Sequence, residues 1–290
     1  MEDAKKSILY MCGATGLYSL NDAFAKLVVT DYPIGNFVVI RSILTLLMLT
    51  PFLINKKRRA EVTSNLKLNA LRSVSASIGT ILMFWALRFM PLAECRLMLF
   101  TAPLFAFLLA KPLLSETLSR QASLSIMIGF LGASVVVFED ISTIDPLALI
   151  VLGSAFLLGL SNVISRMLTV KTSPYSLTLN YTCVMLILGV PFYDSTIAMP
   201  TLEQFMLIAL MSVINLTAQH ALINAFKYGE VSKVAPLEYL ELIYAMVLGF
   251  MIWGTIPNMH LIIGGALVLL SGILIVYKKR VKEENDESLP

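Results

Sequence analysis

Long blocks of apolar residues recur along the whole chain, and they limit the fold more than any other feature. A helix rises 1.5 Å per residue, so a block of about 20 residues crosses the roughly 30 Å of hydrocarbon in a bilayer. Only 14% of the 290 residues are charged, against about 25% in a typical soluble domain. The apolar blocks cover residues 8–29, 34–54, 70–89, 92–111, 121–138, 145–165, 175–193, 204–226, 232–253 and 260–277.

Lipid offers no hydrogen-bond partner to the backbone, so each block must satisfy its own N–H and C=O groups as a helix. The chain lacks the ten-residue segments of alternating polarity that are typical of membrane barrels. The sequence therefore predicts an all-α integral membrane protein with ten transmembrane helices.

Lys and Arg residues concentrate in every second loop. The runs at Lys5–Lys6, at Lys56–Arg59 and at the tail Lys278–Arg280 all fall on one side if the ten blocks are helices. Because basic loops stay on the cytoplasmic side, both termini are predicted to lie in the cytoplasm of a bacterium, with the helices in its inner membrane. The acidic stretch 281–290 is predicted to be a disordered cytoplasmic tail.

The two halves of the sequence resemble each other weakly at a shift of about 140 residues. The shift pairs Lys26 with Arg166, Asn21 with Ser161 and Gly132 with Gly272. Five helices are an odd number, so a second copy enters the membrane from the opposite side. We expect two inverted five-helix repeats, residues 1–140 and 141–280, an arrangement that recurs in secondary transporters.

Ionisable side chains inside membrane helices are costly and point to function. Glu238 and Glu241 lie three residues apart on one helix face, and Tyr244 continues that face. We expect them to line a cavity and to bind a cationic group or a proton. The alternative is that Glu238 reaches the cytoplasmic surface or pairs with Lys233.

Further charges lie near the outer ends of helices in the first half. Arg41, Glu94 and Arg96 are predicted either to form a structural ion pair or to neutralise one another in an outer gate. Asp22 and Lys26 are four residues apart, a spacing that favours an ion pair within one helix.

Aromatic and amide side chains supply the remaining candidates. The aromatic candidates for stacking on a ring or facing a cation are Trp85, Tyr181, Tyr239 and Tyr244. Asn21 and Asn162 can hydrogen-bond to a neighbouring helix or to a ligand. Pro103 and Pro236 are expected to bend their helices around the cavity.

Enzyme and metal motifs are missing from the sequence. It contains no P-loop, no HExxH and no CxxC, and its three cysteines each sit in a different apolar block. We therefore expect no catalytic residues, no metal and no cofactor.

Several short motifs together resemble the ten-helix EamA branch of the drug/metabolite transporter superfamily. They are Asn21 with Lys26, Pro33 followed by Arg41, the stretch from Pro103 to Glu116, Asn162 with Arg166, and APLEY at 235–239 before a Gly-containing helix. This resemblance covers nearly the whole chain. It implies an inverted-repeat fold, a central substrate cavity and transport without ATP hydrolysis.

The resemblance to members with APLEY-like motifs implies an amphiphilic or zwitterionic metabolite as substrate, such as an amino acid derivative, S-adenosylmethionine or riboflavin. An acidic and aromatic cavity favours a cationic, ring-bearing substrate such as S-adenosylmethionine. Export of amino acids or drugs, and import of a riboflavin-type vitamin, are alternatives. A membrane enzyme or a non-transporting subunit are the other classes. The expected partners are the substrate, the lipid bilayer and either protons or a counter-substrate, with a homodimer left open and no nucleic acid.

Overall fold

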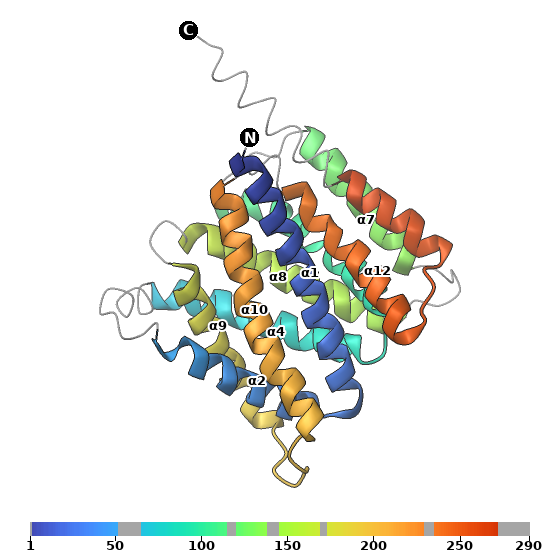
Figure 1. Ribbon diagram of the computed structural model, residues 1–290. Helices are drawn as coiled ribbons and strands as arrows, with labels where there is room; N and C mark the ends of the chain where they lie inside the picture. The colour runs from blue at the N-terminus through green and yellow to red at the C-terminus, as the bar shows by residue number, and fades with distance from the viewer. Residues whose placement is uncertain are drawn as a thin grey trace.

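The computed structural model describes residues 2–51, 65–114, 120–137, 145–168, 173–228 and 235–271, and all regular structure within these ranges is helical (Figure 1). The first half contains α1 (Glu2–Asp31), α2 (Ile34–Leu49), α4 (Leu66–Leu87), α5 (Leu92–Leu99), α6 (Ala102–Leu114) and α7 (Arg120–Val137). The second half contains α8 (Pro146–Leu168), α9 (Pro174–Gly189), the 3-10 turn η2 (Val190–Phe192), α10 (Leu202–Tyr228), the 3-10 turn η3 (Ala235–Tyr239), α12 (Leu240–Trp253) and a last helix, Met259–Ser271. The predicted all-helical class is confirmed for this part of the chain.

Five helical stretches are long and apolar enough to cross a membrane. They are Leu66–Leu87, Leu92–Ala110, Pro146–Ser165, Tyr175–Phe192 and Leu202–Ala225, and three shorter apolar helices accompany them, Ile34–Leu49, Met127–Val136 and Met259–Ser271. The helix α1 begins at Glu2, six residues before the expected start at residue 8. The acidic tail expected at 281–290, and the end of the second repeat beyond Ser271, lie outside the described residues.

Two long helix pairs form the middle of the molecule, α1 with α10 and α4 with α8 (Figure 1). The Ser7 hydroxyl of α1 donates to the carbonyl of Ala225 on α10 at 2.7 Å. The Ser154 hydroxyl of α8 donates to the carbonyl of Gly79 on α4, also at 2.7 Å. Each pair thus joins a helix of the first half to a helix of the second half.

The flanks of the molecule are also made of one helix from each half. The helices α2 and α9 pack together on one side. On the other side α7 lies beside the last helix (Figure 1). A Cβ atom at Gly132 of α7 would meet the carbonyl oxygen of Gly264 at 2.7 Å, so only glycine permits this approach.

Two helices are interrupted near Pro103 and Pro236, where bends were expected. The expected helix 92–111 is divided into α5 and α6 by a turn at Phe100 and Thr101, directly before Pro103. The stretch around Pro236 is the 3-10 turn η3 rather than the start of an α-helix. The ring of Phe100 packs on Tyr239 with centroids 5.2 Å apart, so the two interrupted segments meet inside the molecule.

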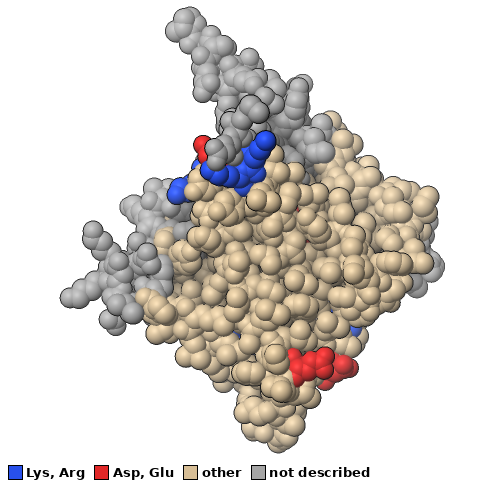
Figure 2. Space-filling view, viewed as in Figure 1, with Lys and Arg blue, Asp and Glu red and all other residues tan. Residues whose placement is uncertain are grey.

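The surface separates charge from a broad apolar face. Figure 2 shows most Lys and Arg side chains at one end of this face, beside a small acidic patch. A larger group of Asp and Glu side chains lies near the other end, with almost no charge between the two ends. Large apolar side chains such as Leu9, Ile187 and Phe250 are exposed. Such a face suits hydrocarbon rather than water.

Candidate functional site: a buried cluster of charged side chains

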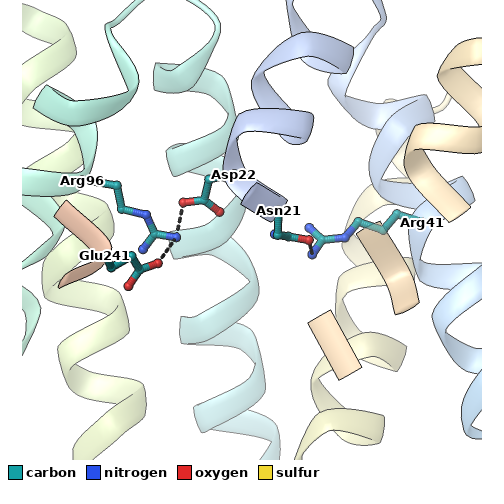
Figure 3. A network of polar contacts seen from close by, with 5 residues as sticks. All are labelled: Asn21, Asp22, Arg41, Arg96 and Glu241. Carbon is teal, nitrogen blue, oxygen red and sulfur yellow. Dashed lines mark hydrogen bonds and ion pairs between the residues drawn. The ribbon is translucent and has the colours of Figure 1, made fainter. Parts of the chain in front are cut away.

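A single guanidinium joins three helices in the interior. Arg96 of α5 points between Asp22 of α1 and Glu241 of α12, and its Nη2 forms an ion pair with Asp22 Oδ2 (Figure 3). The same Nη2 lies 2.9 Å from Glu241 Oε1. The side chain of Asp22 is 4% exposed, while those of Glu241 and Arg96 are 12% and 17% exposed. The cluster is therefore largely buried.

The interrupted helices position two of these three groups. Arg96 lies one turn before the break at Phe100, and Glu241 lies in the first turn of α12, directly after η3. Asp22 projects from the continuous helix α1, which packs along α12. Because helix breaks free backbone polar groups inside a membrane protein, they are tolerated where they line a cavity. The charges thus lie where the backbone itself is irregular.

The cluster is not fully satisfied by hydrogen bonds. Asp22 Oδ2, Glu241 Oε1 and Arg96 Nε are buried without a hydrogen-bond partner among the described residues, so the contacts that hold the two carboxylates are ionic ones. Arginine stays protonated in proteins, so Arg96 is a permanent cation. Two carboxylates that share one cation retain capacity for a further positively charged group. Chemically, the arrangement can bind a cation.

Glu238 and Tyr18 extend the cluster. Glu238, in η3, is half-buried, and Tyr18 of α1 interacts electrostatically with Glu241 and with Glu238. Tyr244 lies against the same helix, since a Cβ atom at Gly16 would be 3.6 Å from its ring. Tyr18 was not predicted from the sequence, although it precedes Asp22 by one turn on the same helix face. Lys233, the alternative partner of Glu238, lies outside the described residues.

A second guanidinium lies on the other side of α1. Arg41 of α2 donates from Nη2 to Asn21 Oδ1 over 3.5 Å, and its guanidinium lies 5.2 Å from the Phe84 ring centroid and 5.9 Å from that of Phe37 (Figure 3). Asn21 and Asp22 are neighbours in sequence but point to opposite sides of α1, one to each guanidinium.

The ion pairs differ from those that the spacing favoured. Lys26 does not pair with Asp22 but donates to the carbonyl of Met90, and its ammonium lies 5.1 Å from the Trp253 ring. Arg96 pairs with Asp22 and Glu241, while Glu94 interacts electrostatically with Lys26. The physical reason is that helix packing brings Arg96 to Asp22. The outer gate of Arg41, Glu94 and Arg96 stays a prediction.

The remaining predicted residues lie apart from the cluster or at its edge. The ring of Tyr239 packs on Phe100, which lies one helical turn after Arg96. The Tyr181 hydroxyl donates to Thr80 Oγ1 at 3.1 Å, between α9 and α4. Trp85 is 40% exposed and packs edge-on against Phe89, and Asn162 is exposed on α8. None of the contacts in the described part of the chain links Trp85 or Asn162 to Arg96.

Comparison with known proteins identifies the class. The model of the EamA-like transporter family matches the chain twice, at residues 5–138 and 146–277. The chain is 23% identical to the pseudopaline exporter CntI of Pseudomonas aeruginosa, covering 95% of this chain and 98% of that protein. It is 21% identical to the S-adenosylmethionine uptake transporter of Rickettsia bellii, covering 90% of each. It is 26% identical to an uncharacterized transporter of Helicobacter pylori, covering 92% of this chain and 93% of that one.

A solved crystal structure shares the fold, with a TM-score of 0.65 and 16% identity over 96% of this chain and 99% of the other. The relatives are named as transporters, not as enzymes, and they include both an exporter and an uptake protein. The family model matches both halves of the chain, and the described residues are apolar and helical, as a membrane transporter requires. This chain is an integral membrane protein that belongs to the EamA-like transporter family.

Proposed function

We propose that this protein is a secondary transporter that moves a small organic metabolite with a cationic group across the bacterial inner membrane by alternating access. The observation that carries the proposal is the meeting of Asp22 and Glu241, one from each half of the chain, at a single guanidinium. A cationic group of the substrate pairs with these carboxylates, and Tyr18, Tyr239 and Tyr244 offer aromatic faces nearby.

The substrate class follows from charge and shape. A carboxylate pair favours an amine, a sulfonium or another cation, and the neighbouring rings favour a planar or apolar body. An amino acid derivative such as S-adenosylmethionine has these features, and a relative from Rickettsia bellii is named for the uptake of that compound. Export of amino acids or drugs remains the alternative direction, since another relative is named as an exporter.

Alternating access rests on the pairing of helices between the halves. If residues 1–140 and 141–280 are inverted repeats of five helices each, α1 corresponds to α8 and α4 to α10. Exchanging the halves then turns the pair α1–α10 into the pair α8–α4, and both pairs are present. The double match of the family model supports the same division. Two such halves can rock about a site that lies between them.

The orientation of the chain is part of the proposal. The basic end of the apolar face in Figure 2 lies toward the N-terminal end of α1, as expected if that end is cytoplasmic. Ten membrane-crossing helices with both termini inside is the arrangement that fits this charge bias. Protons or a counter-substrate then supply the driving force, and Glu238 and Glu241 are the candidate proton carriers.

Uptake into proteoliposomes tests the proposal. Purified protein is reconstituted and offered radiolabelled metabolites with cationic, zwitterionic and anionic groups, with and without a pH gradient. We expect saturable accumulation of a cationic or zwitterionic compound, and its loss in Glu241→Gln. The matched control is Glu203→Gln, because Glu203 is exposed in the first turn of α10. Saturable transport of anionic compounds only, or equal activity of Glu241→Gln and wild type, would contradict the proposal.

A further inference from the structure

Arg41 is a half-buried cation for which the described residues supply no carboxylate at ion-pair distance. Its one hydrogen bond to another residue in the described structure goes to a neutral amide, Asn21, at the long distance of 3.5 Å. Within the same residues, no carboxylate lies at ion-pair distance from it. Arg96, by contrast, is held by two carboxylates. Arg96 is therefore paired with carboxylates of the protein, whereas the Arg41 guanidinium can still pair with the carboxylate of a ligand.

The surroundings of Arg41 orient the guanidinium without neutralising it. The rings of Phe37 and Phe84 are fully buried, and the guanidinium faces both of them. Arg41 itself is only half-buried, although it sits in the middle of α2 beside these buried rings. Aromatic faces stabilise a cation weakly compared with an anion. A planar guanidinium fixed in this way presents donors that match a carboxylate.

The position of Arg41 relative to the carboxylate pair limits what ligand can use both. Asn21 and Asp22 are consecutive residues of α1, and they point to Arg41 and to Arg96 respectively (Figure 3). Arg41 and Asp22 also interact electrostatically. Asp22, Glu241, Arg41 and Arg96 together carry two negative and two positive charges. A ligand with one charge of each sign keeps this balance, whereas a simple cation or anion disturbs it.

We propose that Arg41 binds the carboxylate of a zwitterionic substrate whose cationic group occupies the Asp22–Glu241 side of the site. The inference rests on the proposed transport function and deepens it, because it assigns the substrate class and a residue that determines specificity. Asn21 then positions Arg41 when no substrate is bound. On binding, the substrate carboxylate accepts hydrogen bonds from the guanidinium in place of the Asn21 amide oxygen.

The test compares zwitterions with the amines that they yield on decarboxylation. The pairs are S-adenosylmethionine with its decarboxylated form, L-phenylalanine with phenethylamine, and L-lysine with cadaverine. Each compound is measured as radiolabelled uptake into proteoliposomes, and the ratio of kcat/KM for the zwitterion to kcat/KM for its amine is the readout. Wild-type protein is expected to prefer the zwitterion of at least one pair.

Two variants address Arg41 from opposite sides. In Arg41→Gln the ratio is expected to fall about tenfold or more, since a charge-assisted contact is lost for the zwitterion alone. Arg41→Lys keeps the positive charge but lacks the paired N–H donors. Its kcat/KM ratio should lie between those of wild type and Arg41→Gln. Asn21→Asp supplies a resident carboxylate to Arg41, so it should lower the ratio even if Arg41→Gln fails to fold. The exposed Arg88, changed to Gln, serves as the control.

The outcomes separate this inference from the proposed function. Equal loss for zwitterion and amine in the Arg41 variants, or an unchanged ratio in Asn21→Asp, would make Arg41 structural and overturn the inference while transport stands. Wild-type preference for the amines would overturn it as well. If Glu241→Gln leaves the uptake of every compound unchanged, the proposed function fails, and the inference fails with it.

Discussion

In the proposed repeat the helices α1 and α8 correspond to each other, yet their side chains differ in kind. A shift of 140 residues places Asp22 of α1 on Asn162 of α8. Asp22 is buried and ion-paired, whereas Asn162 is exposed. Several contacts of α8 to other helices involve small residues, such as Ser154 on Gly79 and Gly159 on Ala102. The comparison shows that α1 contributes a charged side chain to the buried cluster, whereas α8 contributes close packing, and we expect the two helices to respond differently to substitution.

Removing the central cation should have the largest effect on the α1 side. Arg96→Gln leaves Asp22 and Glu241 facing each other without a counter-ion, and breaking a buried ion pair in this way costs about 3–5 kcal/mol of unfolding free energy. The 17% exposure of Arg96 places the expected loss toward the lower end. Thermal unfolding in detergent, followed by the size-exclusion profile, measures it.

The double variant Arg96→Gln with Glu241→Gln provides the internal control for that result. It removes one of the two uncompensated carboxylates, so it should recover part of the lost stability. The exposed Arg88→Gln should unfold like wild type. An Arg96→Gln protein as stable as wild type would show that the ion pair contributes nothing to the fold.

The close packing of α8 is tested by adding one methyl group. A Cβ atom at Gly159 would lie 2.6 Å from the carbonyl oxygen of Ala102 and 2.9 Å from Phe105 Cβ, so the backbones of α8 and α6 must separate. Gly159→Ala is expected to cost about 1–3 kcal/mol. Gly153 lies on the same helix, and a Cβ added there meets no atom of another helix within 4 Å in the described part of the chain, so Gly153→Ala is the matched control. Equal stability of the two variants in a detergent melt would refute close packing at Gly159.

A smaller effect is expected where α8 is held by one hydrogen bond. Ser154→Ala removes the 2.7 Å bond to the Gly79 carbonyl and should cost about 0.5–1.5 kcal/mol. Thr217→Val is the comparison, because the Thr217 hydroxyl is exposed and donates to Val213 of its own helix. If Ser154→Ala loses no more stability than Thr217→Val in the same melting assay, this hydrogen bond does not stabilise the α4–α8 contact.

Much of the architecture could be predicted from the sequence because apolar length has one physical solution in lipid. The blocks at 34–54 and 175–193 correspond to α2 and to α9 with η2, and Pro103 and Pro236 mark the two interrupted segments. The break itself was predicted only as a bend. Its turn at Phe100 and Thr101 is held by the Thr101 hydroxyl, which donates to the Met98 carbonyl at 2.6 Å.

The sequence predicted which charged residues are candidates for the site better than it predicted which of them pair with one another. Asp22, Arg96 and Glu241 were all candidates, but sequence spacing reports only on neighbours within one helix, and it favoured Asp22 with Lys26. The pairing with Arg96 depends on how α1, α5 and α12 pack, and the apolar pattern does not encode that angle. Tyr18 was missed because a lone tyrosine in an apolar block is also typical of simple packing.

The smallest expected effect tests whether the space beside α1 is used. Nothing lies within 4 Å of a Cβ added at Gly13, on the same helix as Asp22, so Gly13→Ala meets no obstacle in this structure. Alanine in a helix interior is favoured over glycine by about 0.5–1 kcal/mol, and a small rise in melting temperature is expected. Uptake should stay at the wild-type rate if α1 moves as a rigid body. A protein that is stabilised but transports slowly would instead show that another helix closes on Gly13 during the cycle, and α1 would then be a moving contact as well as the carrier of the charges.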